Sequence, residues 1–107
     1  MASSVSASEV KKIVFACEAG AGSSLIGASQ LKKKLKAAGL KVAVAHSPLH
    51  ALSEDAQIVV AHAVLASQAR SRAPWAVVLS FQTFVGNPVY DQIVEALREG
   101  RDIVETS

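Results

Sequence analysis

The sequence lacks most of what secreted, membrane-spanning and nucleic-acid-binding proteins need. Its 107 residues include one cysteine, which permits no internal disulfide and fits a reducing cytoplasm. No stretch approaches the roughly 20 apolar residues that insert into and span a bilayer, and residues 1–10 lack the apolar segment of a signal peptide. The formal net charge of +2 is too small to indicate nucleic-acid binding. No cysteine–histidine spacing predicts a zinc or other metal site.

Aromatic residues are also scarce, at 5% of the chain. Hydrophobic residues make up 50% and charged residues 19%, a balance typical of a globular domain rather than a disordered chain. The apolar content is mostly alanine and valine, so we expect a core of small, closely packed layers. The length fits one small domain with a single core.

Short apolar runs alternate with helical patterns along the chain. Each run is nearly continuous in valine, isoleucine, phenylalanine or alanine, as in strands that are buried on both faces. Apolar residues at steps of three or four predict the helices between them. The alternation predicts a parallel sheet with helices on both faces. The expected strands are 12–16, 41–45, 57–61 and 75–79, and the expected helices are 24–38, 63–72 and 88–98.

The remaining segments are polar or irregular. We expect a flexible N-terminal tail over residues 1–10, one domain over 11–100, and a C-terminal tail or linker over 101–107. The stretch 46–50 contains a proline and two histidines, and it is expected to form a loop or a short turn of helix.

Cys17 directly follows the first apolar run and begins a segment with two glycines and two serines. That segment joins a strand to a helix, where backbone N–H groups and the helix dipole hold anions. The same field stabilises a thiolate: a cysteine at a helix N-terminus has a pKa of about 3.5–7.5, against about 8.5 when free. Ligands of open parallel sheets bind outside the carboxyl ends of the strands, which is where Cys17 is expected. A buried structural cysteine is the alternative, and the glycines and serines disfavour it.

The cysteine segment lacks the arginine that cysteine-dependent phosphatases and arsenate reductases carry six residues after the cysteine. Ser23 stands there instead. The guanidinium of such an arginine clamps the phosphate and stabilises the charge of the transition state. Acidic residues for protonating a leaving group, such as Asp55 and Asp91, lie in no supporting motif. We therefore expect slow hydrolysis and a phosphocysteine that persists until an acceptor arrives.

The segment from Cys17 to Ser24 reads Cys-x-x-Gly-x-Gly-Ser-Ser. It resembles the loop of the IIB component of the bacterial phosphoenolpyruvate-dependent sugar phosphotransferase system, and most of all that of the mannitol type. Ascorbate-type and galactitol-type IIB domains carry similar loops, so the loop alone is moderately specific. The resemblance covers about residues 11–99. Its further landmarks are Gly27-Ala28, Leu31-Lys32-Lys33-Lys34, Gly39-Leu40, Ala61-His62, Leu79-Ser80-Phe81, Phe84 and Tyr90.

The resemblance implies a three-layer α/β/α fold with a four-stranded parallel sheet, like that of a low-molecular-weight tyrosine phosphatase. It also implies a cytoplasmic phosphoryl carrier that needs no cofactor. Cys17 accepts a phosphoryl group from a phosphohistidine of the IIA partner and passes it to a sugar, mannitol or a related hexitol, bound by the membrane IIC component. The implied phosphate-binding residues are Glu18, Ala19, Gly20, Ala21, Gly22, Ser23 and Ser24.

Some residues depart from the mannitol-type pattern. Glu18 stands where aspartate is usual, Ala21 replaces methionine, and Ala63-Val64 replaces a basic and an acidic residue. These departures leave open which sugar is transported and how the partners are recognised. A IIB-like regulatory domain that senses phosphorylation is the alternative function.

Three further features of the sequence concern a histidine, two phenylalanines and a group of lysines. His62 follows the third run and is a candidate auxiliary residue for the phosphoryl group or a partner, or else a structural histidine. Phe81 and Phe84 either mark an exposed partner surface or pack under the last helix. The lysines of 32–36 are expected to form a solvated helix face.

Overall fold

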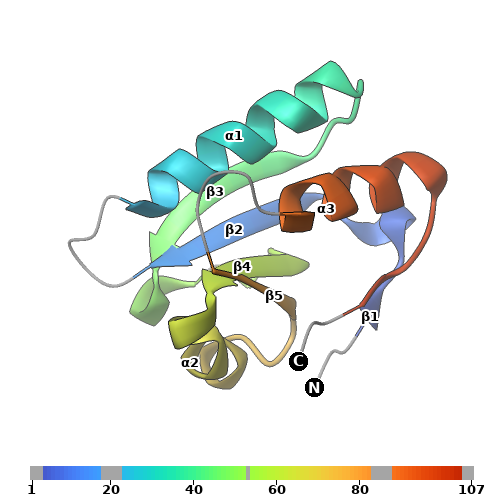
Figure 1. The fold of residues 1–107 in the computed structure, drawn as a ribbon. Helices are drawn as coiled ribbons and strands as arrows, with labels where there is room; N and C mark the ends of the chain where they lie inside the picture. The colour runs from blue at the N-terminus through green and yellow to red at the C-terminus, as the bar shows by residue number, and fades with distance from the viewer. Residues whose placement is uncertain (1–3, 18–22, 53, 83–87, 105–107) are drawn as a thin grey trace.

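A computed structural model describes residues 4–17, 23–52, 54–82 and 88–104, and for residues 17 and 23–26 it describes the backbone. In these ranges four parallel strands form the main sheet, in the order β3-β2-β4-β5 (Figure 1). The chain passes from the inner strand β2 outward to β3 and then crosses back to β4. The strands are β2 (Lys12–Cys17), β3 (Ala43–Pro48), β4 (Ile58–His62) and β5 (Val77–Phe81).

Helices cover both faces of this sheet (Figure 1). Helices α1 (Ser23–Ala37) and α3 (Pro88–Glu99) pack on one face, and α2 (Ala66–Arg72) packs on the other. The arrangement confirms the predicted three-layer α/β/α fold with a four-stranded parallel sheet. Because α1 follows β2 on one face and α2 follows β4 on the other, the topological switch point lies between these two neighbouring strands.

The two sides of the sheet have different cores. On the α1–α3 side, the ring centroid of Phe15 lies 5.6 Å from that of Tyr90 and 6.3 Å from that of Phe81, and all three residues are buried. Under α2 the core consists of small side chains such as Ala61, Ala69 and Val78. The closely packed small layers expected from the composition are therefore found chiefly on the α2 side.

Pairing across the sheet moves several predicted boundaries. Strand β3 begins two residues later than the expected 41–45 and continues to Pro48, so the predicted loop at 46–50 is wrong for its first part. The cause is the register with β2, which pairs Lys12 with Ala43 and Cys17 with Pro48. The expected short helical turn follows as η2 (Leu49–Ala51).

The strand expected at 75–79 is also displaced and forms at Val77–Phe81 instead. A backbone hydrogen bond of 3.1 Å from Ala76 N–H to Ala73 O keeps the residues before it in a turn. Helix α2 is preceded by the 3₁₀ turn η3 (Ala63–Leu65), so the predicted helix at 63–72 consists of two pieces.

Short strands form near both ends of the described chain. Strand β1 (Ser4–Val5) pairs antiparallel with β6 (Ile103–Val104), whereas the sequence predicts tails there. The 3₁₀ turn η1 (Ala7–Glu9) connects β1 to the main sheet. The pairing has a hydrophobic cause, because Ile103 is buried in the core and Val5 packs against the same cluster. Burial of these side chains compensates for the entropy of ordering short segments.

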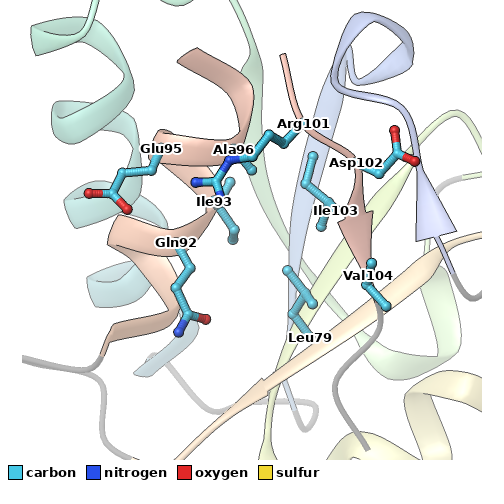
Figure 2. A pocket seen from close by; sticks show the side chains of 9 residues that line it. All are labelled: Leu79, Gln92, Ile93, Glu95, Ala96, Arg101, Asp102, Ile103 and Val104. Carbon is cyan, nitrogen blue, oxygen red and sulfur yellow. The ribbon is translucent and has the colours of Figure 1, made fainter. Parts of the chain in front are cut away.

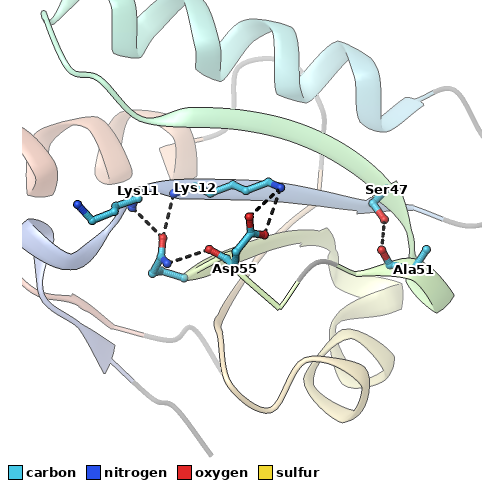
Figure 3. A network of polar contacts seen from close by, with 6 residues as sticks. Lys11, Lys12, Ser47, Ala51 and Asp55 are labelled. Carbon is cyan, nitrogen blue, oxygen red and sulfur yellow. Dashed lines mark hydrogen bonds and ion pairs between the residues drawn. The ribbon is translucent and has the colours of Figure 1, made fainter.

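The side chain of Gln57 joins the beginning of β4 to the segment that enters β2. Its Oε1 accepts hydrogen bonds from the backbone N–H groups of Lys11 at 2.7 Å and Lys12 at 2.9 Å. Its Nε2 donates to the backbone oxygen of Asp55 at 2.9 Å, and the carboxylate of Asp55 pairs with Lys12 Nζ at 3.2 Å (Figure 3). These contacts lie at the amino ends of the strands.

We expect Gln57→Ala to lower the free energy of unfolding by about 1–2 kcal/mol, because two backbone donors lose their acceptor. Denaturant unfolding of wild type and variant measures the difference. The matched control is Gln68→Ala on α2, where the glutamine is exposed and the change should stay within about 0.5 kcal/mol. Equal effects of the two substitutions would show that the Gln57 contacts contribute nothing.

Candidate functional site

The carboxyl ends of the parallel strands bring the site residues to one edge of the sheet. Strand β2 ends at Cys17 beside Pro48, the last residue of β3. On its other side β2 pairs Ala16 with Ala61, so His62 is the next residue on the neighbouring strand. His62 in turn pairs with Phe81 at the end of β5. The carboxyl ends of all four strands therefore lie at the edge of the sheet where Cys17 ends β2.

Helix α1 begins close in sequence to Cys17. Its backbone is helical from Ser23, so five residues separate the end of β2 from the first turn of a 15-residue helix. Of the predicted phosphate-binding residues, Ser23 and Ser24 form the beginning of this helix, and Glu18, Ala19, Gly20, Ala21 and Gly22 lie outside the described residues. A helix N-terminus presents backbone N–H groups without intrahelical partners, and these bind anions.

Gly27 determines how closely α1 approaches the sheet. A Cβ atom at this position would lie 2.6 Å from Phe15 Cε2 and 2.6 Å from the hydroxyl oxygen of Tyr90. Real side chains do not come so close, so a larger residue requires the helix or the rings to move. Glycine at this position thus allows the first turns of α1 to pack directly on β2, the strand that ends at Cys17.

His62 is held by backbone groups through both ring nitrogens. Its Nδ1 accepts a hydrogen bond of 3.2 Å from the backbone N–H of Val64 and thereby caps the turn η3. Its Nε2 lies 3.0 Å from the backbone oxygen of Gln82. The ring also packs edge-on against Phe81, with centroids 5.8 Å apart and planes at 82°. The sequence gives no signal for these bonds, because the partners are main-chain atoms.

Of the hydrophobic residues described at this edge, Phe81 is buried and Val64 is exposed. Phe81 is 4% exposed and its centroid lies 6.1 Å from that of Tyr90 on α3, so the interpretation as a core residue under the last helix is correct. Phe84 lies outside the described residues. Val64, in contrast, is 77% exposed on η3, two residues after His62.

The two acidic residues considered as phosphatase acids, Asp55 and Asp91, both form ion pairs with lysines. Asp55 pairs with Lys12, the first residue of β2, at the end of that strand opposite Cys17. Asp91, on α3, pairs with Lys34 Nζ at 2.9 Å, beside the later turns of α1. Each of these two carboxylates is therefore engaged by a lysine.

The lysines of α1 and the other two histidines are exposed. The α1 lysines at 32, 33, 34 and 36 are exposed, which confirms the predicted solvated face. His46 is exposed on β3, and His50 is exposed on η2. Among the described residues, no group of three or more His, Cys, Asp or Glu side chains could hold a metal ion. In the same part of the chain, no helix has the length and apolar character to cross a membrane.

A cavity of about 280 Å³ lies between α3 and β6 (Figure 2). Apolar side chains of β5, α3 and β6, such as Leu79, Ile93 and Ile103, form part of its lining, and Glu95, Arg101 and Asp102 add charge. Arg101 and Asp102 follow the last turn of α3, and no lining residue belongs to the carboxyl end of a strand of the main sheet. The cavity is therefore separate from the candidate site.

Comparison with known proteins gives a consistent family assignment. Residues 12–96 match the family model described as "PTS system, Lactose/Cellobiose specific IIB subunit". The "PTS system mannitol-specific EIICB component" of Geobacillus stearothermophilus is 44% identical over 91 residues, which cover 85% of this chain and 19% of that protein. The protein of the same name from Bacillus subtilis (strain 168) is 41% identical over 98 residues, which cover 92% of this chain and 20% of that protein.

A relative named as an EIICBA component and a solved structure are also similar to this chain. The "PTS system mannitol-specific EIICBA component" of Pasteurella multocida is 43% identical over 88 residues, which cover 82% of this chain and 14% of that protein. The chain thus spans about a fifth or less of the length of these relatives. The lactose-specific IIB domain structure from Streptococcus pneumoniae superposes with a TM-score of 0.59 at 10% identity, covering 85% of this chain and 90% of that one. This likeness confirms the fold.

Proposed function

Because this chain belongs to the family of phosphotransferase-system IIB subunits, we propose that it is a phosphoryl carrier with Cys17 as the covalent site. The supporting observation is the position of Cys17 at the carboxyl end of β2, at the topological switch point and with five residues between it and α1. At this position a thiol gains the anion-stabilising field of a helix N-terminus.

The proposed transfer consists of two displacements at phosphorus. The Cys17 thiolate attacks a phosphohistidine of the IIA partner, an S–P bond forms, and the P–N bond breaks with its electron pair returning to the imidazole. A sugar hydroxyl on the IIC partner then attacks the same phosphorus. The S–P bond breaks, the thiolate is regenerated, and the hydroxyl proton passes to a base on the acceptor side. A thiolate of low pKa suits both steps, because it is a nucleophile and a good leaving group.

The residues after Cys17 would hold the phosphoryl oxygens. We assign this role to the backbone N–H groups from Glu18 to Ser24, with a hydroxyl of Ser23 or Ser24 adding a hydrogen bond. Gly20 and Gly22 suit a loop whose N–H groups all turn toward one anion. Asp55 and Asp91, the two carboxylates considered as leaving-group acids, are engaged by Lys12 and Lys34, which supports transfer over hydrolysis.

Mannitol or a related hexitol is the proposed substrate, because several relatives are named mannitol-specific. Their component names, EIICB and EIICBA, also support partners of the IIC and IIA types. We further propose that the chain works at the cytoplasmic face of the membrane. Ala63 and Val64 are exposed where the mannitol type favours charged residues, so partner recognition here is expected to be less ionic.

The intact mass of the protein tests this proposal. The chain is incubated with phosphoenolpyruvate, the general phosphocarrier proteins and a mannitol-type IIA protein. We expect the mass of one phosphoryl group to be added, and to be lost when mannitol and membranes containing IIC are supplied. An unchanged mass in the presence of an active IIA protein would contradict the carrier function and favour a regulatory binding domain.

A further inference from the structure

The hydrogen bonds of His62 define which nitrogen of its ring carries the proton. Nδ1 accepts from the N–H of Val64, so it has no proton of its own when the ring is neutral. The single proton is therefore on Nε2, which donates to the carbonyl of Gln82. The bond at Nδ1 joins residues two positions apart. The bond at Nε2 crosses from β4 to the residue after β5, 20 positions along the chain.

These bonds hold a surface beside the end of β2. We call it the rim and define it as residues 62–64 together with Gln82. Val64 is 77% exposed and Gln82 is exposed, so the rim faces solvent. Ala16 on β2 pairs with Ala61 on β4, and Cys17 and His62 are the next residues of the two strands. The rim therefore begins on the strand next to that of the cysteine.

The His62 ring is held in one orientation by three contacts. Phe81 packs against it edge-on, and both nitrogens are engaged by main-chain groups. A direct contact with a phosphoryl group would require one of these bonds to break and would leave a main-chain group without its partner.

We propose that His62 is a positioning residue, which keeps the rim in one shape so that the phosphorylated donor protein docks on a preformed surface. The inference rests on the proposed function of Cys17 and extends it to a residue that does not touch the phosphoryl group. A rim that is already ordered spares the donor the entropy of ordering it on docking. Loss of the ordered shape of the rim should therefore raise the KM for the donor and leave kcat nearly unchanged.

Two substitutions of His62 each keep one of its two hydrogen bonds and remove the other. Asparagine keeps an acceptor at the distance of Nδ1 and still caps η3, but its amide is too short to reach the carbonyl of Gln82. Glutamine has an N–H donor at the distance of Nε2 and can restore the bond between β4 and β5. We expect His62→Asn to raise the KM for the phosphorylated IIA donor about tenfold, and His62→Gln to stay within about twofold of the wild type.

Steady-state transfer from the phosphorylated IIA donor through Cys17 to mannitol, with membranes containing IIC in excess, measures both constants, and the melting temperature checks folding. His46→Gln, at an exposed position on β3, is the matched control and should change neither constant. A fall of kcat in both His62 variants at constant KM would overturn the proposal in favour of direct contact with the phosphoryl group. Equal KM values for asparagine, glutamine and histidine would overturn it as well.

A spectroscopic test does not depend on phosphoryl transfer. Long-range ¹H–¹⁵N correlation spectra at alkaline pH, where imidazoles are neutral, distinguish the tautomers of a histidine ring. We expect His62 to carry its proton on Nε2, and a proton on Nδ1 would overturn the proposal. The protein's failure to accept a phosphoryl group would, in contrast, contradict the carrier function and leave this tautomer result standing.

Discussion

A Cys17→Ser variant is expected to lose phosphoryl transfer by at least about 10⁴-fold while it keeps its fold. Removal of the nucleophile from an enzyme with a covalent intermediate lowers turnover by up to about 10⁶-fold. A serine hydroxyl is weakly nucleophilic unless a neighbouring base removes its proton, and the described carboxylates of Asp55 and Asp91 are engaged by lysines elsewhere. The helix field that stabilises a thiolate is too weak to ionise a hydroxyl.

The amount of labelled phosphate on the protein, followed with time at a fixed concentration of phosphorylated IIA, gives the transfer rate. Because the chain has a single cysteine, a double variant, Cys17→Ser with Ser29→Cys, supplies a matched control. It restores one thiol to the chain at an exposed position on α1. This control should be as inactive as Cys17→Ser. Transfer by Cys17→Ser, or its recovery in the double variant, would contradict the assignment of Cys17.

A Gly27→Ala substitution should lower the free energy of unfolding by about 1–3 kcal/mol, although alanine in a helix interior ordinarily adds about 1 kcal/mol of stability. The new Cβ would lie 2.6 Å from both Phe15 Cε2 and the Tyr90 oxygen. Neither ring can turn aside freely, because Phe15 and Tyr90 are buried and pack on each other and on Phe81. Relief therefore requires α1 to move away from β2.

Thermal unfolding measures this effect, since each kcal/mol corresponds to a shift of roughly 4–8 °C in a domain of this size. The matched control is Ser29→Ala, two residues later on the exposed side of α1, which should change stability by less than about 0.5 kcal/mol. In a Phe15→Leu background, which removes the ring, the cost of Gly27→Ala should shrink, and a double-mutant cycle measures that coupling. A stabilised Gly27→Ala protein would show that α1 does not pack this closely.

The Gly27 variant also connects stability to the proposed function. The contact of Gly27 with Phe15 lies one turn after the start of α1 and two residues before Cys17 on β2. A helix that moves outward takes its N-terminus with it, so the field at the cysteine should weaken. The sequence resemblance marks Gly27 as a shared residue, and the structure supplies the physical reason for it.

The sequence by itself determined the layer architecture and the place of Cys17. Apolar runs and helical spacing are local signals, and the alternation of strand and helix leaves few arrangements other than a parallel sheet covered on both faces. A cysteine directly after the first run must then stand at the carboxyl end of a strand. The roles of Cys17 and of the residues that follow it remain predictions, which the variants above test.

Tertiary structure decided the features that depend on contacts between distant segments. The register between β2 and β3 placed His46 in a strand, and burial of Ile103 ordered β6 against β1. The choice between core and surface for Phe81 was settled by packing against α3. His62 could not be interpreted from its neighbours in sequence, because one of its bonds reaches a backbone carbonyl 20 residues away. Side-chain patterns report the periodicity of one segment, whereas main-chain partners are fixed only when the segments pack together.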